Sequence, residues 1–213
     1  MAGGEGGVTG RWDRTEAALR LSAILCSGVS ALALVAHVLG FLPMPFFLEV
    51  FGIPSLLVLL ALVAFAKKID AEMFLNGLWV GLCAGVVATL VYDGVRLLVE
   101  RGHPFGYSGF VPILMFGSWI TGQPSASIAA KLAGWSYHYW NGTTFGIIYS
   151  LGFGKRHWLF GVGYGIVLEC CMLGLFPLFV PVTNKVDFIA VSMIGHVAYG
   201  AVLGALVQRY VRW

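Results

Sequence analysis

Long runs of apolar residues alternate along this chain with short segments rich in charge, glycine or proline. A helix needs about 20 mainly apolar residues to cross the hydrocarbon core of a membrane. Six runs reach that length, and they cover residues 19–41, 46–66, 73–99, 125–151, 158–180 and 188–210. The pattern therefore predicts an all-α polytopic membrane helix bundle with six spanning helices.

The segment at about 104–124 is apolar in its middle, but it is too short to cross and is interrupted by Pro104, Pro112 and Pro124. Basic residues decide between six and seven crossings, because they concentrate on the cytoplasmic side of a membrane. With six crossings, one side holds Arg11, Arg14, Arg20, Lys67, Lys68, Lys155, Arg156, Arg209 and Arg212. The other side holds only Arg96, Arg101, Lys131 and Lys185. We therefore predict that both termini are cytoplasmic and that 104–124 is a re-entrant or surface segment on the outer side.

Composition supports a single membrane domain. Only 11% of the 213 residues are charged, less than half of the roughly 25% that is usual in soluble domains. The bilayer is therefore the expected main partner, with a cytoplasmic segment at 1–18 and one transmembrane domain over 19–213. The small net charge of +3, from scattered basic residues, argues against a nucleic-acid partner. The cysteines lie in apolar runs and show no zinc-knuckle spacing or disulfide framework.

Glycines in the second half of the chain often lie four residues apart. The pattern His138-x3-Gly142-x3-Gly146 occurs again as His196-x3-Gly200-x3-Gly204. Small residues at this spacing let two helices approach closely in lipid, where packing and polar contacts must drive association. The glycines therefore predict tight helix packing and carry no function by themselves.

Each of the last four predicted helices carries an ionisable residue near its glycine face: Asp93, His138, Glu169 and His196. At about 1.5 Å per residue, all four lie about 10–14 Å below the outer ends of their helices. Asp93 fits the glycine face least well, because its glycine, Gly85, is eight residues away. Ionisable residues inside a membrane are costly and normally face the bundle interior, where they have partners. The sequence therefore predicts one buried polar layer in the outer half of the bundle.

The leading hypothesis for this layer is a metal site, with Asp93, His138, Glu169 and His196 as ligands. Two imidazoles and two carboxylates suit zinc, iron or manganese, and bundle cores often hold such sites on facing helices. Neighbouring polar residues could support the ligands from behind, namely Tyr92, Tyr137, Tyr139, Asn141 and Tyr199.

Three alternatives stay open. The four residues could only pair and hold helices together, as in a structural or accessory subunit with a membrane-protein partner or a second copy. His138 and His196 could bind haem, although haem needs no carboxylates. The layer could relay protons, although no series of such groups continues to the cytoplasmic side. Whether the chain is an enzyme is undecided, since no Walker loop, nucleophile elbow or zinc-protease motif occurs in it.

Three segments, 81–93, 134–149 and 195–204, resemble segments of uncharacterised bacterial multi-pass membrane proteins. The resemblance covers the last four predicted helices. It implies a protein of the bacterial cytoplasmic (inner) membrane, and it implies no particular activity, cofactor or substrate.

Overall fold

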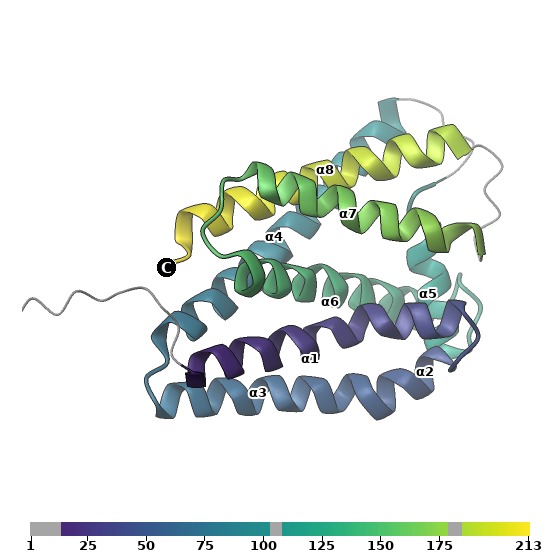
Figure 1. Ribbon diagram of the computed structural model, residues 1–213. Helices are drawn as coiled ribbons and strands as arrows, with labels where there is room; N and C mark the ends of the chain where they lie inside the picture. Colours follow the sequence, from purple (N-terminus) through teal and green to yellow (C-terminus); the bar gives the residue numbers. More distant parts are fainter. Residues whose placement is uncertain (1–13, 103–107, 179–184) are drawn as a thin grey trace, which may run out of the picture.

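The computed structural model describes residues 14–102, 108–178 and 185–213, and the elements within them are all helical. They are α1 (Arg14–Val38), α2 (Met44–Phe47), η1 (Leu48–Gly52), α3 (Ile53–Lys68), α4 (Glu72–Gly102), α5 (Val111–Thr121), α6 (Ile128–Phe153), α7 (Leu159–Leu175), η2 (Phe176–Leu178) and α8 (Lys185–Tyr210). The long helices run side by side along one bundle (Figure 1). The predicted all-α bundle is confirmed. Of the predicted N-terminal segment 1–18, residues 1–13 lie outside the described residues. Residues 14–18 form the beginning of α1.

In the described part of the chain, five helical stretches are long and apolar enough to cross a membrane. They are α1, the continuous stretch from α2 to α3, α4, α7 with η2, and α8. These stretches support a multi-pass membrane protein. The remaining predicted crossing is the fourth one, α6, which has 26 residues, or about 39 Å of helix, but a more polar middle.

The polar side chains of α6 face neighbouring helices. The Tyr137 hydroxyl donates to the Ser30 carbonyl of α1 at 2.6 Å, and the Thr144 and Ser30 hydroxyls are 2.8 Å apart. On another side, His138 contacts Asp93 of α4. Because other helices satisfy these groups, α6 can lie in the middle of the bundle with a lower hydropathy than its neighbours.

The segment predicted as re-entrant or surface contains the short helix α5. Its 11 residues extend about 16 Å, roughly half of a hydrocarbon core. It ends at Gly122, whose φ of 67° is left-handed, and it packs on the first turns of α6. There Gly117 lies directly against the Ala130 carbonyl and Gly134 against the Ile113 carbonyl. Residues 103–107 of this segment lie outside the described residues.

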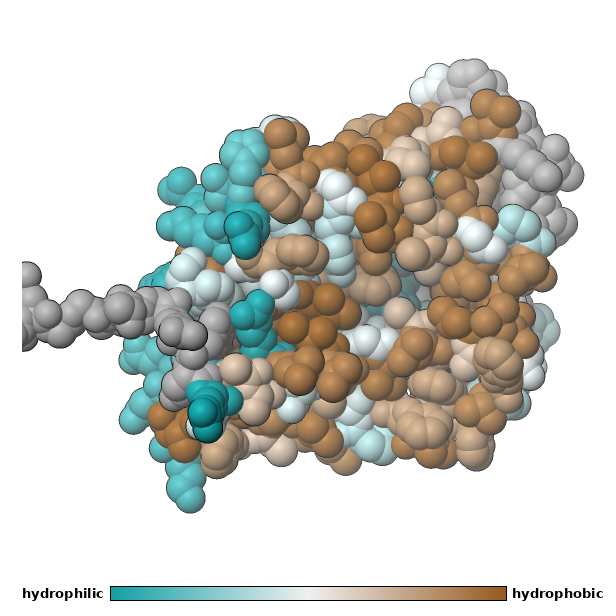
Figure 2. All heavy atoms as spheres, in the orientation of Figure 1, coloured by the Kyte–Doolittle hydropathy of each residue, from teal (hydrophilic) through white to brown (hydrophobic). Residues whose placement is uncertain are grey.

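Charge separates the two ends of the bundle. Arg14 begins α1, Lys67 and Lys68 lie in the last turn of α3, and Arg209 lies in the last turn of α8, all at the same end of the bundle (Figure 1). Figure 2 shows hydrophilic residues gathered at this end and a hydrophobic surface over the rest of this face. The basic residues that share a side in the six-crossing scheme therefore share an end of the molecule, as far as they are described.

Besides the contact of α5 with α6, glycines form two close seams between long helices in the part of the chain that the structure describes. In the first, Gly81 and Gly85 of α4 face Gly142 and Gly146 of α6, so that a Cβ on Gly146 would lie 2.6 Å from the Gly85 Cα. In the second, Gly161 and Gly165 of α7 face α8. There, a Cβ on Gly161 would lie 2.6 Å from the Gly204 Cα. The predicted role of the glycines in packing is confirmed, and the seams join α4 to α6 and α7 to α8.

Candidate functional site

The first predicted site pair joins the two helices of the first seam. His138 Nε2 of α6 lies 3.1 Å from both carboxylate oxygens of Asp93 of α4. One turn after Asp93, the guanidinium of Arg96 lies 3.9 Å from Asp93 Oδ1. Arg96 is only 5% exposed, so this is a buried cation. Asp93 therefore lies between an imidazole and a guanidinium.

The second pair joins the helices of the second seam. His196 Nδ1 of α8 lies 2.8 Å from Oε2 of Glu169 of α7, and Glu169 is fully buried. The Ser192 hydroxyl donates to the same carboxylate oxygen at 2.7 Å. The backbone carbonyl of Ser192 lies 3.0 Å from His196 Nδ1. A carbonyl oxygen can only accept, so Nδ1 carries a hydrogen.

Tyr92 connects the two pairs. Its ring centroid lies 5.9 Å from that of His138 and 4.9 Å from that of His196. The Arg96 guanidinium lies over the same ring, at 4.7 Å from its centroid. The four predicted site residues therefore occur in one region of the bundle, but as two carboxylate–histidine pairs.

This arrangement gives no support to a metal site shared by Asp93, His138, Glu169 and His196. Among the described residues, no group of three or more His, Cys, Asp or Glu side chains is placed to hold a metal ion. Each imidazole is directed at its own carboxylate, and each pair is held by its own helix seam. Zinc, iron or manganese binding therefore stays a prediction from the sequence, and so does haem.

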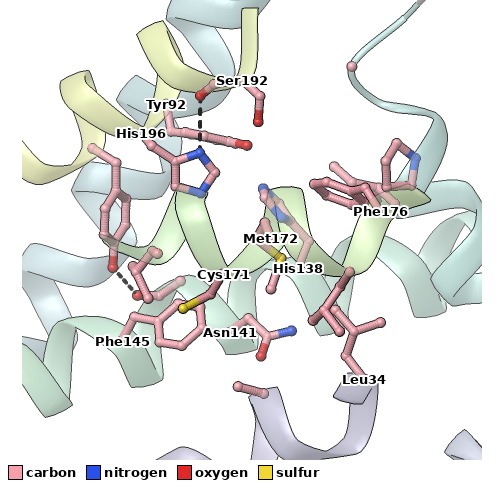
Figure 3. Close-up of a pocket in the computed structure, with 18 of the residues that line it drawn as sticks. Leu34, Tyr92, His138, Asn141, Phe145, Cys171, Met172, Phe176, Ser192 and His196 are labelled. Atoms are coloured by element: carbon pink, nitrogen blue, oxygen red, sulfur yellow. Dashed lines mark hydrogen bonds between the residues drawn. The ribbon is translucent and has the colours of Figure 1, made fainter. Parts of the chain in front are cut away.

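A cavity of about 300 Å³ lies beside the pairs, and both histidines form part of its wall. Residues of α1, α4, α5, α6, α7 and α8 line it. Its lining is mainly apolar, with Leu34, Phe145, Met172 and Phe176 among the larger side chains (Figure 3). In Figure 3 the second ring nitrogen of His196, Nε2, is directed into this space, away from Ser192.

Several polar atoms at the cavity have unused hydrogen-bonding capacity. Arg96 Nε and Asn141 Oδ1 are buried and have no hydrogen-bond partner among the described residues, and both residues line the cavity. Glu169 Oε1, directly behind His196, is in the same situation. Buried polar groups in folded proteins are nearly always satisfied. Two such atoms, Arg96 Nε and Asn141 Oδ1, lie in the wall of one cavity, where a further molecule would give them partners.

The cavity opens toward the side of the bundle. Cys171 of α7 lines it and is also exposed, so this residue lies at its mouth. The half-buried Ala31 and Val35 of α1 line the cavity as well. Figure 2 shows recessed hydrophilic atoms near the middle of this hydrophobic face. The mouth therefore faces the part of the surface that lipid would cover.

The chain matches no family model, no curated protein and no solved structure. Its function is therefore inferred from this cavity and from the residues around it.

The two helix pairs are built on one pattern, which the sequence revealed only in part. In the second pair, Gly161-x3-Gly165-x3-Glu169 faces His196-x3-Gly200-x3-Gly204. In the first pair, the segment Gly85-x3-Thr89-x3-Asp93 faces His138-x3-Gly142-x3-Gly146. Thr89 takes the middle position, because it lies against Gly142 and turns its hydroxyl back to the Gly85 carbonyl at 2.8 Å.

This register explains why Asp93 lies eight residues from its glycine: a threonine replaces the glycine between them. The sequence contained the signal, but a search for glycines alone passes over Thr89. Of the residues expected to support the site, Tyr92, Asn141 and Tyr199 do line the cavity. Tyr137 instead bonds to α1. Ser192 was not expected from the sequence, although it lies one helical turn before His196 and on the same face.

Proposed function

We propose that the protein crosses a bacterial cytoplasmic membrane six times and binds a small, mainly apolar molecule in the cavity between its two glycine-packed helix pairs. In this proposal α6 is the fourth crossing, both termini are cytoplasmic, and the cavity lies in the outer half of the bundle. The molecule enters from the bilayer through the mouth at Cys171.

The observation that carries this proposal is a mainly apolar cavity whose wall contains two histidines and buried polar atoms without partners. Ligand sites commonly have this composition, an apolar lining with a few polar groups that fix orientation. Backed by Asp93 and Glu169, His138 and His196 are held in fixed orientations, and each has one ring nitrogen left for a ligand.

The main rival is a structural or accessory subunit in which the pairs only hold helices together. Polar groups that only join helices are expected to form hydrogen bonds with one another. Arg96 Nε and Asn141 Oδ1, in contrast, have no hydrogen-bond partner among the described residues. This difference favours a binding site over a purely structural role of the two pairs.

The number of crossings can be tested with reporters fused to truncated chains. A fusion after Gln123, before α6, is expected to place alkaline phosphatase outside, where the enzyme is active. A fusion after Arg156, after α6, is expected to be inactive as a phosphatase and to fluoresce with green fluorescent protein instead. Equal behaviour of both fusions would show that α6 does not cross and would overturn the six-crossing proposal.

Binding can be tested by native mass spectrometry of the detergent-purified protein. We expect a co-purified amphiphile that is lost at least tenfold in the variant Ala31→Trp, because the indole would fill the mouth of the cavity. The control Leu32→Trp lies next to it on the exposed side of α1 and is expected to retain the molecule. Equal retention in both variants would contradict binding in this cavity. Stoichiometric zinc, iron or manganese, or a Soret band, would favour the metal or haem hypothesis instead.

A further inference from the structure

We propose that the bound molecule is a single-chain anionic amphiphile, a carboxylate or a phosphate monoester on one hydrocarbon chain. Its head contacts Arg96, and its chain leaves the cavity between α1 and α7. This inference rests on the proposed function and adds the chemical class of the ligand.

Arg96 is the main reason to expect a negative head group. The residue is 5% exposed and lines the cavity, and a buried guanidinium is costly without anionic partners. The nearest described carboxylate is Asp93, at 3.9 Å, and both oxygens of Asp93 are already shared with His138. The Glu100 carboxylate also lies near the guanidinium, since both flank Gly109, but it bonds to Ser108 and Gly109. Among the described residues, the guanidinium therefore has no carboxylate within hydrogen-bond distance.

The stacking of Arg96 leaves its edges for a ligand. Its guanidinium lies 4.7 Å from the Tyr92 ring centroid and 4.8 Å from that of Phe110. These contacts occupy the faces of a planar group whose N–H donors all lie in its plane. Of these donors, Nε is buried without a partner. A guanidinium with free in-plane donors is suited to carboxylate and phosphate oxygens, which it binds in pairs.

The remaining polar atoms fit the same head group. With Nδ1 of His196 bonded to Glu169, Nε2 is left on the cavity side for a polar atom of the head group. Arg96 and His196 both contact the Tyr92 ring, at 4.7 and 4.9 Å from its centroid, and both line the cavity. Between them they could hold two oxygens of one head group.

The size and mouth of the cavity favour one chain. About 300 Å³ is at the lower end of the range for ligand pockets, enough for a head group and the first part of one chain. The rest must leave through the mouth at Cys171. Ala31 and Val35 of α1 and Leu168 and Leu175 of α7 line the cavity and are half-buried. These residues are apolar, as a hydrocarbon chain requires.

The test uses the full chain in lipid nanodiscs and a photoactivatable palmitate that carries a diazirine in its chain. We expect adducts on α1 and α7, at least tenfold more than with the methyl ester of the same probe, which has no charge. A single-chain phosphate monoester with the same diazirine distinguishes the two possible head groups, since the natural one is expected to compete better. Equal labelling by acid and ester would overturn the anionic head, even if Ala31→Trp still blocked labelling and so upheld a binding cavity.

Substitutions of Arg96 provide a second test of the proposal. Arg96→Gln is expected to reduce palmitate labelling at least tenfold and Arg96→Lys by a smaller factor, with ester labelling unchanged in both. The unchanged ester signal shows that the variants are folded. Arg101→Gln, an exposed position on the same helix, is the matched control and is expected to label like the parent. Unchanged acid labelling in Arg96→Gln would overturn the assignment of the head group to Arg96.

Adjacent cysteines report on the path of the chain. Two variants each keep one cysteine, either Cys171, which lines the mouth, or Cys170, which is exposed but does not line the cavity. Bound palmitate is expected to slow the reaction of Cys171 with a lipid-soluble maleimide at least fivefold and to leave Cys170 unaffected. Equal protection of both thiols, or of neither, would overturn an exit between α1 and α7.

Discussion

Replacing Gly161 with alanine is expected to destabilise the bundle by about 3 kcal/mol, because a single methyl group overpacks the α7–α8 seam. A Cβ at Gly161 would press against the Gly200 carbonyl oxygen and lie 2.7 Å from the Gly204 nitrogen. Both contacts are backbone atoms of α8, so no side chain can turn away to relieve them, and the two helices must separate. The measurement is the free energy of unfolding of the detergent-solubilised protein.

The control is two residues further along the same helix. Gly163 is exposed, and a Cβ there would meet nothing within 4 Å. Because alanine favours a helix over glycine by about 1 kcal/mol, Gly163→Ala is expected to be neutral or stabilising. Only Gly161→Ala is therefore expected to lower the free energy of unfolding. A loss of stability in both, or in neither, would mean that the seam does not hold α7 and α8 in the close contact described.

The second large effect concerns the carboxylate–histidine pairs. His196→Leu is expected to cost about 3 kcal/mol, because it leaves the fully buried Glu169 without its imidazole partner. The double variant Glu169→Leu/His196→Leu removes both polar groups and is expected to recover most of that loss. The coupling within this pair is then about 2 kcal/mol in a double-mutant cycle on the free energy of unfolding.

The informative comparison is the cycle across the pairs. Glu169 and His138 belong to different seams, and their coupling is expected to be below about 0.5 kcal/mol. If all four residues shared one metal ion, removing any one ligand would weaken the others, and cross-pair coupling would equal coupling within a pair. Equal couplings would therefore restore the shared metal site, whereas the two-pair arrangement requires unequal ones.

Most of the fold could be predicted because apolar length decides where a helix can cross a membrane. The long helices lie within a few residues of the six apolar runs. The run at 46–66 is one such helix, yet the π turn at Leu48–Gly52 inside it was not predicted. That turn lies where a Cβ on Gly52 would be 2.9 Å from the Trp140 ring. A contact between residues so far apart in sequence leaves no signal in local hydropathy.

The sequence also determined which residues meet at the site, but not how they pair. Asp93, His138, Glu169 and His196 could be recognised because an ionisable residue is costly in a membrane and helix geometry sets its depth. Depth alone leaves every pairing among the four equally open. The choice depends on which helices touch, and this is decided by the glycine seams.

The sequence by itself thus determined the helices, the end of the bundle where most basic residues gather, the glycine faces and the four ionisable residues near them. Each follows from the length, composition or period of one segment. Only the tertiary structure decided that the layer divides into Asp93–His138 and Glu169–His196 and that an apolar cavity lies beside them. The tertiary structure also showed that Arg96 Nε and Asn141 Oδ1 are buried without a hydrogen-bond partner, which can be recognised only when the surroundings of an atom are known. These features depend on the shapes of several helices at once, so no single stretch of the chain encodes them.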